Sequence, residues 1–274
     1  MNSKILRIHL RMPVAHWRIP FTQQNLHRTY PLPPPSTVLG MIHNLCGCKT
    51  GEVIKGIDIA IAGRYEFVFY QYQIFRNLYK DKKSAYKEAH RGGSMPNKVQ
   101  LLGNVELYIY IKDEGACLEK KGEQENEFFD RIVDAFRNPS MPFILGRRED
   151  IAIVEDIKEN IQLTEREMPL YTKIPLWVPE EKTEELGLHG VSYLLPTYYN
   201  LENGIRNFER NWYVYVESQP VDLNANDEIP KCLVDTVELE KENRKMKIQI
   251  PVVFLGIDVK KNSEDNDDAK GNTG

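Results

Sequence analysis

Within residues 4–12, the positions from 6 to 12 alternate between apolar and basic side chains, and this alternation constrains the fold more than any other feature of the chain. The apolar positions are Leu6, Ile8, Leu10 and Met12, and the basic positions between them are Arg7, His9 and Arg11. Successive side chains of a β-strand point to opposite faces of its sheet. The pattern therefore predicts a half-buried strand whose apolar face lies in the core and whose basic face meets solvent.

The segments that follow predict helices and further strands in the order of an α+β fold. Prolines between residues 31 and 35 forbid a helix there, after which Ser36 or Thr37 can cap a helix that ends near Gly47. The other expected elements are strands within 57–70, 105–112 and 151–154 and a helix at 126–137. The order β-α-β-β-α-β favours a ferredoxin-like or RRM-like N-terminal domain over residues 1–160.

The later part of the chain has a different character. Residues 161–261 are interpreted as a smaller β-rich C-terminal part, because their clearest patterns, at 212–216 and 246–255, are those of strands. Residues 262–274 are polar and acidic and contain no aromatic residue. Such a composition cannot bury enough apolar surface to fold, so we expect a disordered tail.

The sequence predicts neither a membrane segment nor a metal site. No apolar run approaches the length that crosses a bilayer, and the first residues lack a secretory signal, so we expect a cytoplasmic protein with no membrane partner. Of the four cysteines only Cys46 and Cys48 lie close together, and no second Cys or His pair accompanies them. We therefore expect reduced thiols and no cofactor.

Charge is strongly segregated along the chain. Residues 1–100 hold 15 Lys and Arg against 5 Asp and Glu, whereas the remaining 174 residues hold 21 against 35. The two parts thus have net charges of +10 and −14, which give the −4 of the whole chain. Because phosphate binding depends on local basic surface rather than on the total charge, this segregation favours nucleic-acid binding by the first part.

A basic stretch at 76–100 interrupts the strand pattern. It lacks apolar periodicity and has a glycine pair at 92–93, which predicts a mobile insertion, such as a hairpin, between two strands of the sheet. The cations of this stretch that we expect to hold phosphates are Arg76, Lys80, Lys82, Lys83, Arg91 and Lys98.

Aromatic and basic residues alternate before this stretch, as is typical of segments that grip single-stranded RNA. The candidate RNA-binding residues here are His16, Trp17, Arg18, Arg28 and Tyr30, together with Arg7, Arg11 and Arg64 on the same basic surface. Either Tyr30 or Trp17 can stack a base, although core packing is an equal alternative for Trp17. Arg147 and Arg148 follow a glycine that permits a tight turn, and they either contact phosphate or pair with Glu149 or Asp150.

Motifs of known catalytic machinery are missing from the sequence. There is no Walker phosphate loop, no H-E-x-x-H and no G-x-S-x-G. A metal-independent ribonuclease needs a general base near a 2′-hydroxyl and a donor for the developing charge. His27, Tyr30 and a lysine of the insertion could supply them if the fold brings them together, but both residues are interpreted first as RNA-contacting or packing residues.

Three segments carry a resemblance to a known family. Residues 29–41 (TYPLPPPSTVLGM) resemble the early loop-helix signature of the CRISPR-associated Cas-five family, and residues 142–150 (PFILGRRED) resemble its later proline, glycine and arginine motif. Residues 194–199 (LLPTYY) resemble the C-terminal part of the type I-B branch. These anchors lie between about residue 15 and about residue 216.

The resemblance implies a subunit that caps one end of the backbone of a type I Cascade surveillance complex. Such a subunit grips the 5′ handle of the mature crRNA, contacts the backbone subunit and the large subunit, and meets target DNA only through the complex. The inserted thumb hairpin of the family would correspond to residues 76–100. The implied role is antiviral defence by RNA binding, without catalysis.

Two rival functions stay open. The type I-C branch of the family cuts precursor crRNA itself with Tyr, Lys and His, a set that does not align securely with this sequence. The C-terminal pattern resembles the branch that leaves cutting to a separate endoribonuclease. A general RNA-binding module unconnected with CRISPR is the other rival, and it predicts no preference for a repeat-derived handle.

Overall fold

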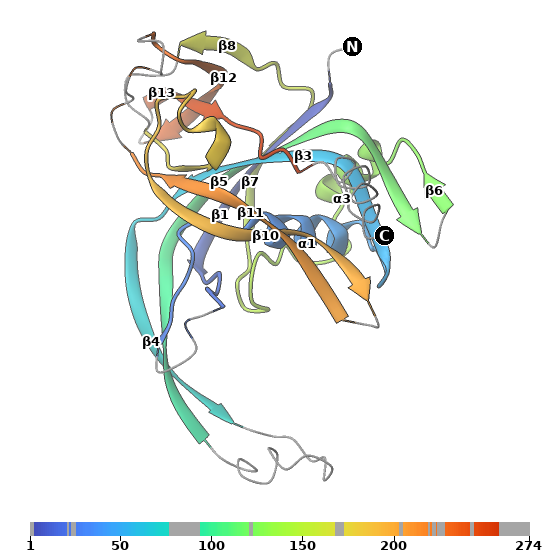
Figure 1. Ribbon diagram of the computed structural model, residues 1–274, viewed down its shortest axis with the longest axis vertical. Helices are drawn as coiled ribbons and strands as arrows, with labels where there is room; N and C mark the ends of the chain where they lie inside the picture. Colours follow the sequence, from blue (N-terminus) through green and yellow to red (C-terminus); the bar gives the residue numbers. More distant parts are fainter. Residues whose placement is uncertain are drawn as a thin grey trace, which may run out of the picture.

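The computed structural model describes residues 3–20, 22, 26–76, 94–120, 123–167, 173–202, 205–218, 220, 223, 228–241 and 244–257, and it is mostly β-sheet with few helices. Its elements are β1 (Ile5–Ala15), β2 (Leu26–His27), α1 (Pro35–Leu45), β3 (Glu52–Arg64), β4 (Phe67–Arg76), β5 (Ser94–Lys120), β6 (Glu123–Glu125), α3 (Phe129–Arg137), β7 (Ile153–Lys158), β8 (Thr164–Glu167), β9 (Leu176–Pro179), η1 (Glu180–Lys182), β10 (Val191–Glu202), β11 (Ile205–Val216), β12 (Lys231–Lys241) and β13 (Arg244–Val252). Figure 1 shows their arrangement.

The alternation at residues 4–12 forms β1, as expected. Leu6, Ile8, Leu10 and Met12 are all fully buried. They pack in one core with the apolar faces of α1 and α3, which both cover this side of the sheet. β1 lies between β5 and β7 and is antiparallel to both, and β5 in turn pairs with β3.

Helix α1 begins at Pro35, two to three residues earlier than a cap at Ser36 or Thr37 predicts. Pro34 is extended, Pro35 occupies the first turn, and no side chain among the described residues caps the helix. Proline suits this position because the first-turn N–H has no helical partner in any case. The expected capping role of Ser36 or Thr37 is therefore wrong, whereas the predicted end at Gly47 is confirmed by its φ of +68°.

A second sheet, β13-β12-β8, covers the face of the main sheet opposite the helices. Consequently Arg7, which was expected on a solvent-facing basic surface, is only 2% exposed. Its Nη1 lies 2.8 Å from Asp235 on β12 and its Nη2 lies 2.7 Å from Asp156 on β7. Arg7 is thus an internal cation that joins the two sheets, and it is not part of a binding surface.

The first half of β5 pairs with β4 in a long ribbon that extends away from the rest of the molecule (Figure 1). The pairing runs from Phe67 opposite Gly103 to Arg76 opposite Ser94. This ribbon is the paired base of the insertion expected at 76–100, and it begins nine residues before that range. Residues 77–93, with Lys80, Lys82, Lys83 and Arg91, lie outside the described part of the chain.

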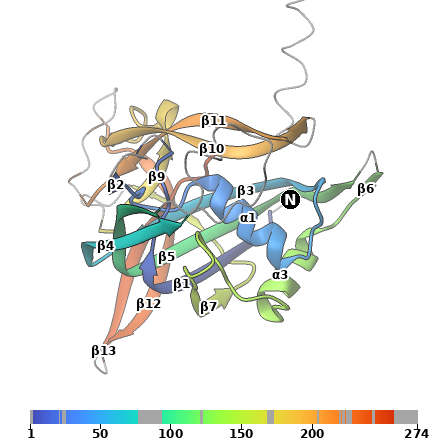
Figure 2. The same ribbon diagram turned by 90° about the horizontal axis from the view of Figure 1, so that it is seen from below.

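Strands of the later part of the chain extend the main sheet. β9, β11 and β10 follow β3 in the sheet order, so β10 forms the end of this path (Figure 2). The proline-rich loop before α1 is held by the indole of Trp177 on β9, whose Nε1 donates to the Pro33 carbonyl at 3.0 Å.

The expected boundary at residue 160, between the N-terminal domain and the C-terminal part, stays a prediction. Among the described residues, no helix is long and apolar enough to span a bilayer.

Candidate nucleic-acid interface

The two aromatic and basic motifs of the N-terminal region lie side by side. Arg18 and Thr29 form an antiparallel bridge. Backbone hydrogen bonds flank it, from Ile19 N to Arg28 O at 2.9 Å and from Tyr30 N to Trp17 O at 2.7 Å. Two segments that are separate in the sequence therefore present their side chains from one short two-stranded turn.

The aromatic rings of these segments pack into the core. Trp17 is buried, and its Nε1 donates to the Leu145 carbonyl at 2.9 Å. Tyr30 is also buried and meets Tyr193 edge to face at 5.6 Å, and burial raises the pKa of its hydroxyl. Packing, which the sequence left as an alternative to base stacking, is what the structure describes for both rings.

Two buried histidines lie under this turn. The Nδ1 atom of His16 lies 2.7 Å from the Gln100 carbonyl, so this nitrogen holds the proton of the neutral ring. Burial lowers the pKa of His16, and the nearby Arg147 lowers it further. The Nε2 atom of His27 lies 2.9 Å from the amide nitrogen of Asn97 on β5, so it accepts the amide hydrogen. Both rings thus have fixed orientations.

The loop after residue 142 brings further arginines to the same place. Arg147 contacts Asp150 three times: its backbone N and its Nε lie 2.8 and 3.0 Å from Oδ2, and its Nη2 lies 2.7 Å from Oδ1. Gly146 has a φ of +136°, and a Cβ there would lie 2.8 Å from the same carboxylate. The salt-bridge alternative therefore describes Arg147, while Arg148 is exposed.

Four cations of this region are exposed and form no ion pair with any other described residue: Arg18, Arg28, Lys98 and Arg148. We call these four, with His16, His27 and Arg147, the arginine–histidine patch. Lys98 belongs to it because β2 pairs Leu26 with Lys98, beside the contact between His27 and Asn97. The patch thus combines four free cations with two buried histidines whose rings have fixed orientations.

The remaining predicted cations do not extend the patch. Arg11 pairs with Glu155 at 2.7 Å, and Arg64 pairs with Glu106 at 2.7 Å. Burial alone would favour the neutral form of Glu106, but hydrogen bonds from His9, Arg64 and Tyr108 lower its pKa to about 2. Arg11 and Arg64 are therefore neutralised locally. Of Arg76, the structure describes the backbone, at the end of β4.

The ribbon of β4 and β5 adds residues that the sequence reasoning missed. Tyr70 and Tyr72 on β4 are 59% and 64% exposed. Their cross-strand neighbours are Gln100 and Lys98, so Tyr72 stands beside a cation of the patch. Opposite residues of an antiparallel pair share a face. The alternation of Tyr70, Tyr72 and Ile74 with glutamines was the available signal, but exposed aromatics cannot be told from buried ones by period alone.

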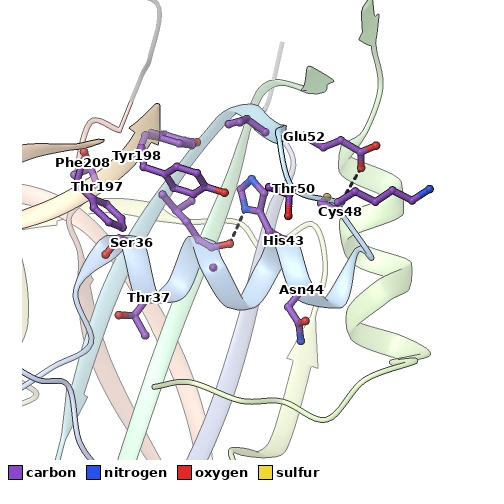
Figure 3. A pocket seen from close by; sticks show the side chains of 15 residues that line it. Ser36, Thr37, His43, Asn44, Cys48, Thr50, Glu52, Thr197, Tyr198 and Phe208 are labelled. Carbon is purple, nitrogen blue, oxygen red and sulfur yellow. Dashed lines mark hydrogen bonds between the residues drawn. The ribbon is translucent and has the colours of Figure 1, made fainter. Parts of the chain in front are cut away.

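A cavity lies between α1 and the β10–β11 pair. It has a volume of about 440 Å³, and it contains the partly buried imidazole of His43 (Figure 3). The Nδ1 atom of His43 lies 2.7 Å from the Leu39 carbonyl, and its Nε2 accepts from the Ile54 N–H at 2.9 Å. Burial lowers its pKa. Since both ring nitrogens bond to the backbone, His43 has a structural role.

All four cysteines are free thiols. Burial raises the pKa of Cys46 to about 12 and that of Cys48 to about 11, so neither forms a thiolate near neutral pH. Among the described residues, no group of three His, Cys, Asp or Glu side chains is arranged to hold a metal ion.

Among known protein families, one family model matches most of the chain. The family model described as "CRISPR-associated protein (Cas_Cas5)" matches residues 5–212. No curated protein matches the sequence. The chain is similar to a solved structure titled "CRISPR RNA-guided surveillance complex", with 13% identity, 81% of this chain and 95% of that chain covered, and a TM-score of 0.46.

Two further solved structures are similar at the same level. One is titled "Crystal structure of Cas protein", with 15% identity, a TM-score of 0.42, and 83% of this chain and 98% of that chain covered. The other is a CRISPR protein from Archaeoglobus fulgidus, with 13% identity, a TM-score of 0.34, and 89% and 98% covered. The assignment to a family rests on the family model alone.

Proposed function

The chain belongs to the Cas5 family of CRISPR-associated proteins, and from this premise we propose that it binds the 5′ handle of a crRNA within a type I Cascade complex, of the I-B type. The observation that supports this most is the arginine–histidine patch, which has four free cations and whose Lys98 lies opposite the exposed Tyr72 of the ribbon. Phosphates need cations that are not already neutralised, and unpaired bases need exposed aromatic rings.

The proposed platform is the four-strand unit β3-β5-β1-β7 with α1 and α3, which we infer to be RRM-like. Its ribbon of β4 and β5 would be the thumb. The proposed partners are the crRNA, the backbone subunit and the large subunit, with target DNA reached only through the complex. We place this assembly in the cytoplasm.

We infer that the chain holds RNA without cutting it. The Nε2 atom of His27 accepts a hydrogen bond from Asn97, which occupies the lone pair that a general base would use. Tyr30, the other residue considered for catalysis, is buried against Tyr193. Incubation of the purified protein with repeat RNA in EDTA tests this: we expect intact RNA. A specific cut that His27→Ala or Tyr30→Phe abolishes would establish the endoribonuclease instead.

Specificity is tested by competition. The purified chain is titrated with the repeat-derived handle RNA and with a shuffled RNA of the same length and composition. We expect tighter binding of the handle. Equal affinities would indicate a general RNA-binding module, and the absence of binding to either would contradict the proposed function.

A further inference from the structure

One tryptophan differs from the other two in its surroundings. Trp17 and Trp177 are buried, whereas Trp212 on β11 is 51% exposed. Leu194, which lies directly opposite Trp212 on β10, is also exposed. Because directly opposite residues share a face, the two form an apolar pair on one side of the β10–β11 ribbon.

This exposed pair lies where the packed core between the two sheets ends. Val214, two residues further along β11 and on the same face, is buried in the core between the two sheets. Tyr213, on the other face, is buried against the helix side. Trp212 therefore lies at the margin of a packed region, and its strand is held firmly on both sides.

A cavity of about 440 Å³ opens beside the indole. Its walls include Pro179, Tyr213 and Leu255, and its acidic groups are Glu180 and Glu181 of η1. The Oε1 atom of Glu180 accepts from the Ser192 hydroxyl at 3.0 Å, which fixes this carboxylate beside the β10–β11 pair.

The charge of this cavity is not compensated by its lining. The described residues that line it include no Lys or Arg. Lys182, which follows Glu181 in the chain, donates instead to the Phe254 carbonyl at 3.1 Å, and Arg210, which precedes Asn211 on β11, is exposed and does not line the cavity. An exposed indole beside two carboxylates is the opposite of the arginine–histidine patch, because it repels phosphate and attracts cations.

We propose that this cavity, which we call the Trp212 cleft, receives an arginine side chain from a protein partner. A guanidinium can lie over the indole face while its N–H groups meet the carboxylates, and its methylene stem can contact Pro179 of the lining. Trp, Tyr and Arg are enriched among the few residues that contribute most of the binding energy of protein interfaces. The inference goes beyond RNA binding and does not depend on the proposed function.

The test uses the full chain labelled with 5-fluorotryptophan. The three tryptophans give three fluorine signals, and the Trp212→Phe variant identifies the signal of the cleft. The probe is a short Gly-Arg-Gly peptide with blocked ends, and its control contains citrulline, the neutral isostere of arginine. We expect the arginine peptide to shift the Trp212 signal while the Trp17 and Trp177 signals stay in place.

Variants separate the carboxylates from the aromatic ring. We expect the double change Glu180→Gln with Glu181→Gln to lower the affinity for the arginine peptide several-fold. Trp212→Ala, for which calorimetry measures the affinity, should lower it about two- to fivefold. Glu184→Gln is the matched control, because Glu184 is an exposed carboxylate of the same turn that does not line the cleft. Equal shifts with the citrulline peptide, or no shift with either peptide, would overturn the proposal.

A second measurement distinguishes this proposal from the proposed function. The affinity of Trp212→Ala for handle RNA should equal that of the natural chain, since the cleft repels phosphate. A loss of RNA affinity in this variant, with its fold intact by circular dichroism, would place the cleft in the RNA site and overturn the inference of a basic protein partner. Failure of the natural chain to bind handle RNA would contradict only the proposed function.

Discussion

The buried side chain of Arg7 joins the two sheets of the molecule. Its guanidinium bonds to Asp235 of one sheet and to Asp156 of the other, and the Tyr110 hydroxyl donates to the same Asp235 oxygen at 3.1 Å. Burying an arginine is tolerated only when its charge is paired. The cluster is therefore sensitive to the loss of any one partner.

Replacing Asp235 with alanine should destabilise the protein severely. The change leaves Arg7 buried beside one carboxylate, and breaking a buried ion pair in this way costs about 3–5 kcal/mol of unfolding free energy. Urea denaturation measures it. The control is Glu238→Ala, which removes an exposed pair with Lys247 and should change the unfolding free energy by at most about 1 kcal/mol. Equal effects of the two variants would contradict the assigned role of Arg7.

The Glu106 carboxylate should make stability depend on pH. Its pKa is about 2 in the folded protein against 4.5 for the free group. A lowered folded-state pKa stabilises the protein above pH 4.5, and this stabilisation is lost as the pH falls towards 2. We expect Glu106→Gln to cost about 3 kcal/mol at neutral pH.

Unfolding free energies of both proteins across the acid range check this prediction. The difference between the natural chain and Glu106→Gln should shrink steadily as the pH falls below 4.5, the ordinary pKa of the carboxyl group. If the difference in unfolding free energy stayed constant as the pH fell to about 2, His9, Arg64 and Tyr108 would not stabilise the Glu106 carboxylate.

Among the elements, the ribbon of β4 and β5 is distinguished by exposed aromatic side chains that lie close to a cation of the patch. Tyr70 and Tyr72 are exposed on one face of it, and Lys98 lies opposite Tyr72. Such a surface suits unpaired bases, since every base offers a face that can stack on an aromatic ring. The ribbon should therefore affect RNA affinity without affecting stability.

Replacing both Tyr70 and Tyr72 with alanine should weaken handle binding. Each stacked base contributes about 1–3 kcal/mol, so a loss of affinity of at least about fivefold is expected if even one ring stacks. Fluorescence anisotropy with labelled handle RNA measures it, and the melting temperature should not change. The double change to phenylalanine keeps the rings and should keep the affinity. A phenylalanine variant as weak as the alanine variant would rule out stacking.

How far the sequence predicts these elements depends on how local their causes are. The period of two gave β1 and its buried face, and Gly47 gave the end of α1, because both follow from nearby residues. The burial of Arg7 could not be predicted, since its partner Asp235 lies 228 residues away. For Arg147 the decisive partner, Asp150, is local, and the sequence did offer that alternative.

Across the whole molecule, charge of each sign is concentrated on different elements. The arginine–histidine patch is built from the β1–β2 region, β5 and the loop before β7, whereas the Trp212 cleft is built from β9, η1 and β11. This matches the excess of cations in residues 1–100 and of carboxylates after them. We therefore propose one surface of the molecule for RNA and another, of opposite charge, for a basic protein.

The most direct test of the central claim is the salt dependence of handle binding. For single-stranded RNA, the logarithm of the affinity falls with the logarithm of the salt concentration by about 0.7 for each phosphate contact. We predict a clear negative slope that becomes shallower by about 1.4 when Arg28 and Arg148 are both changed to glutamine. The same change at Arg11 and Arg64, whose charges are already paired, should leave the slope unaltered. An affinity that is independent of salt, or a slope that only the Arg11 and Arg64 variant alters, would contradict the account.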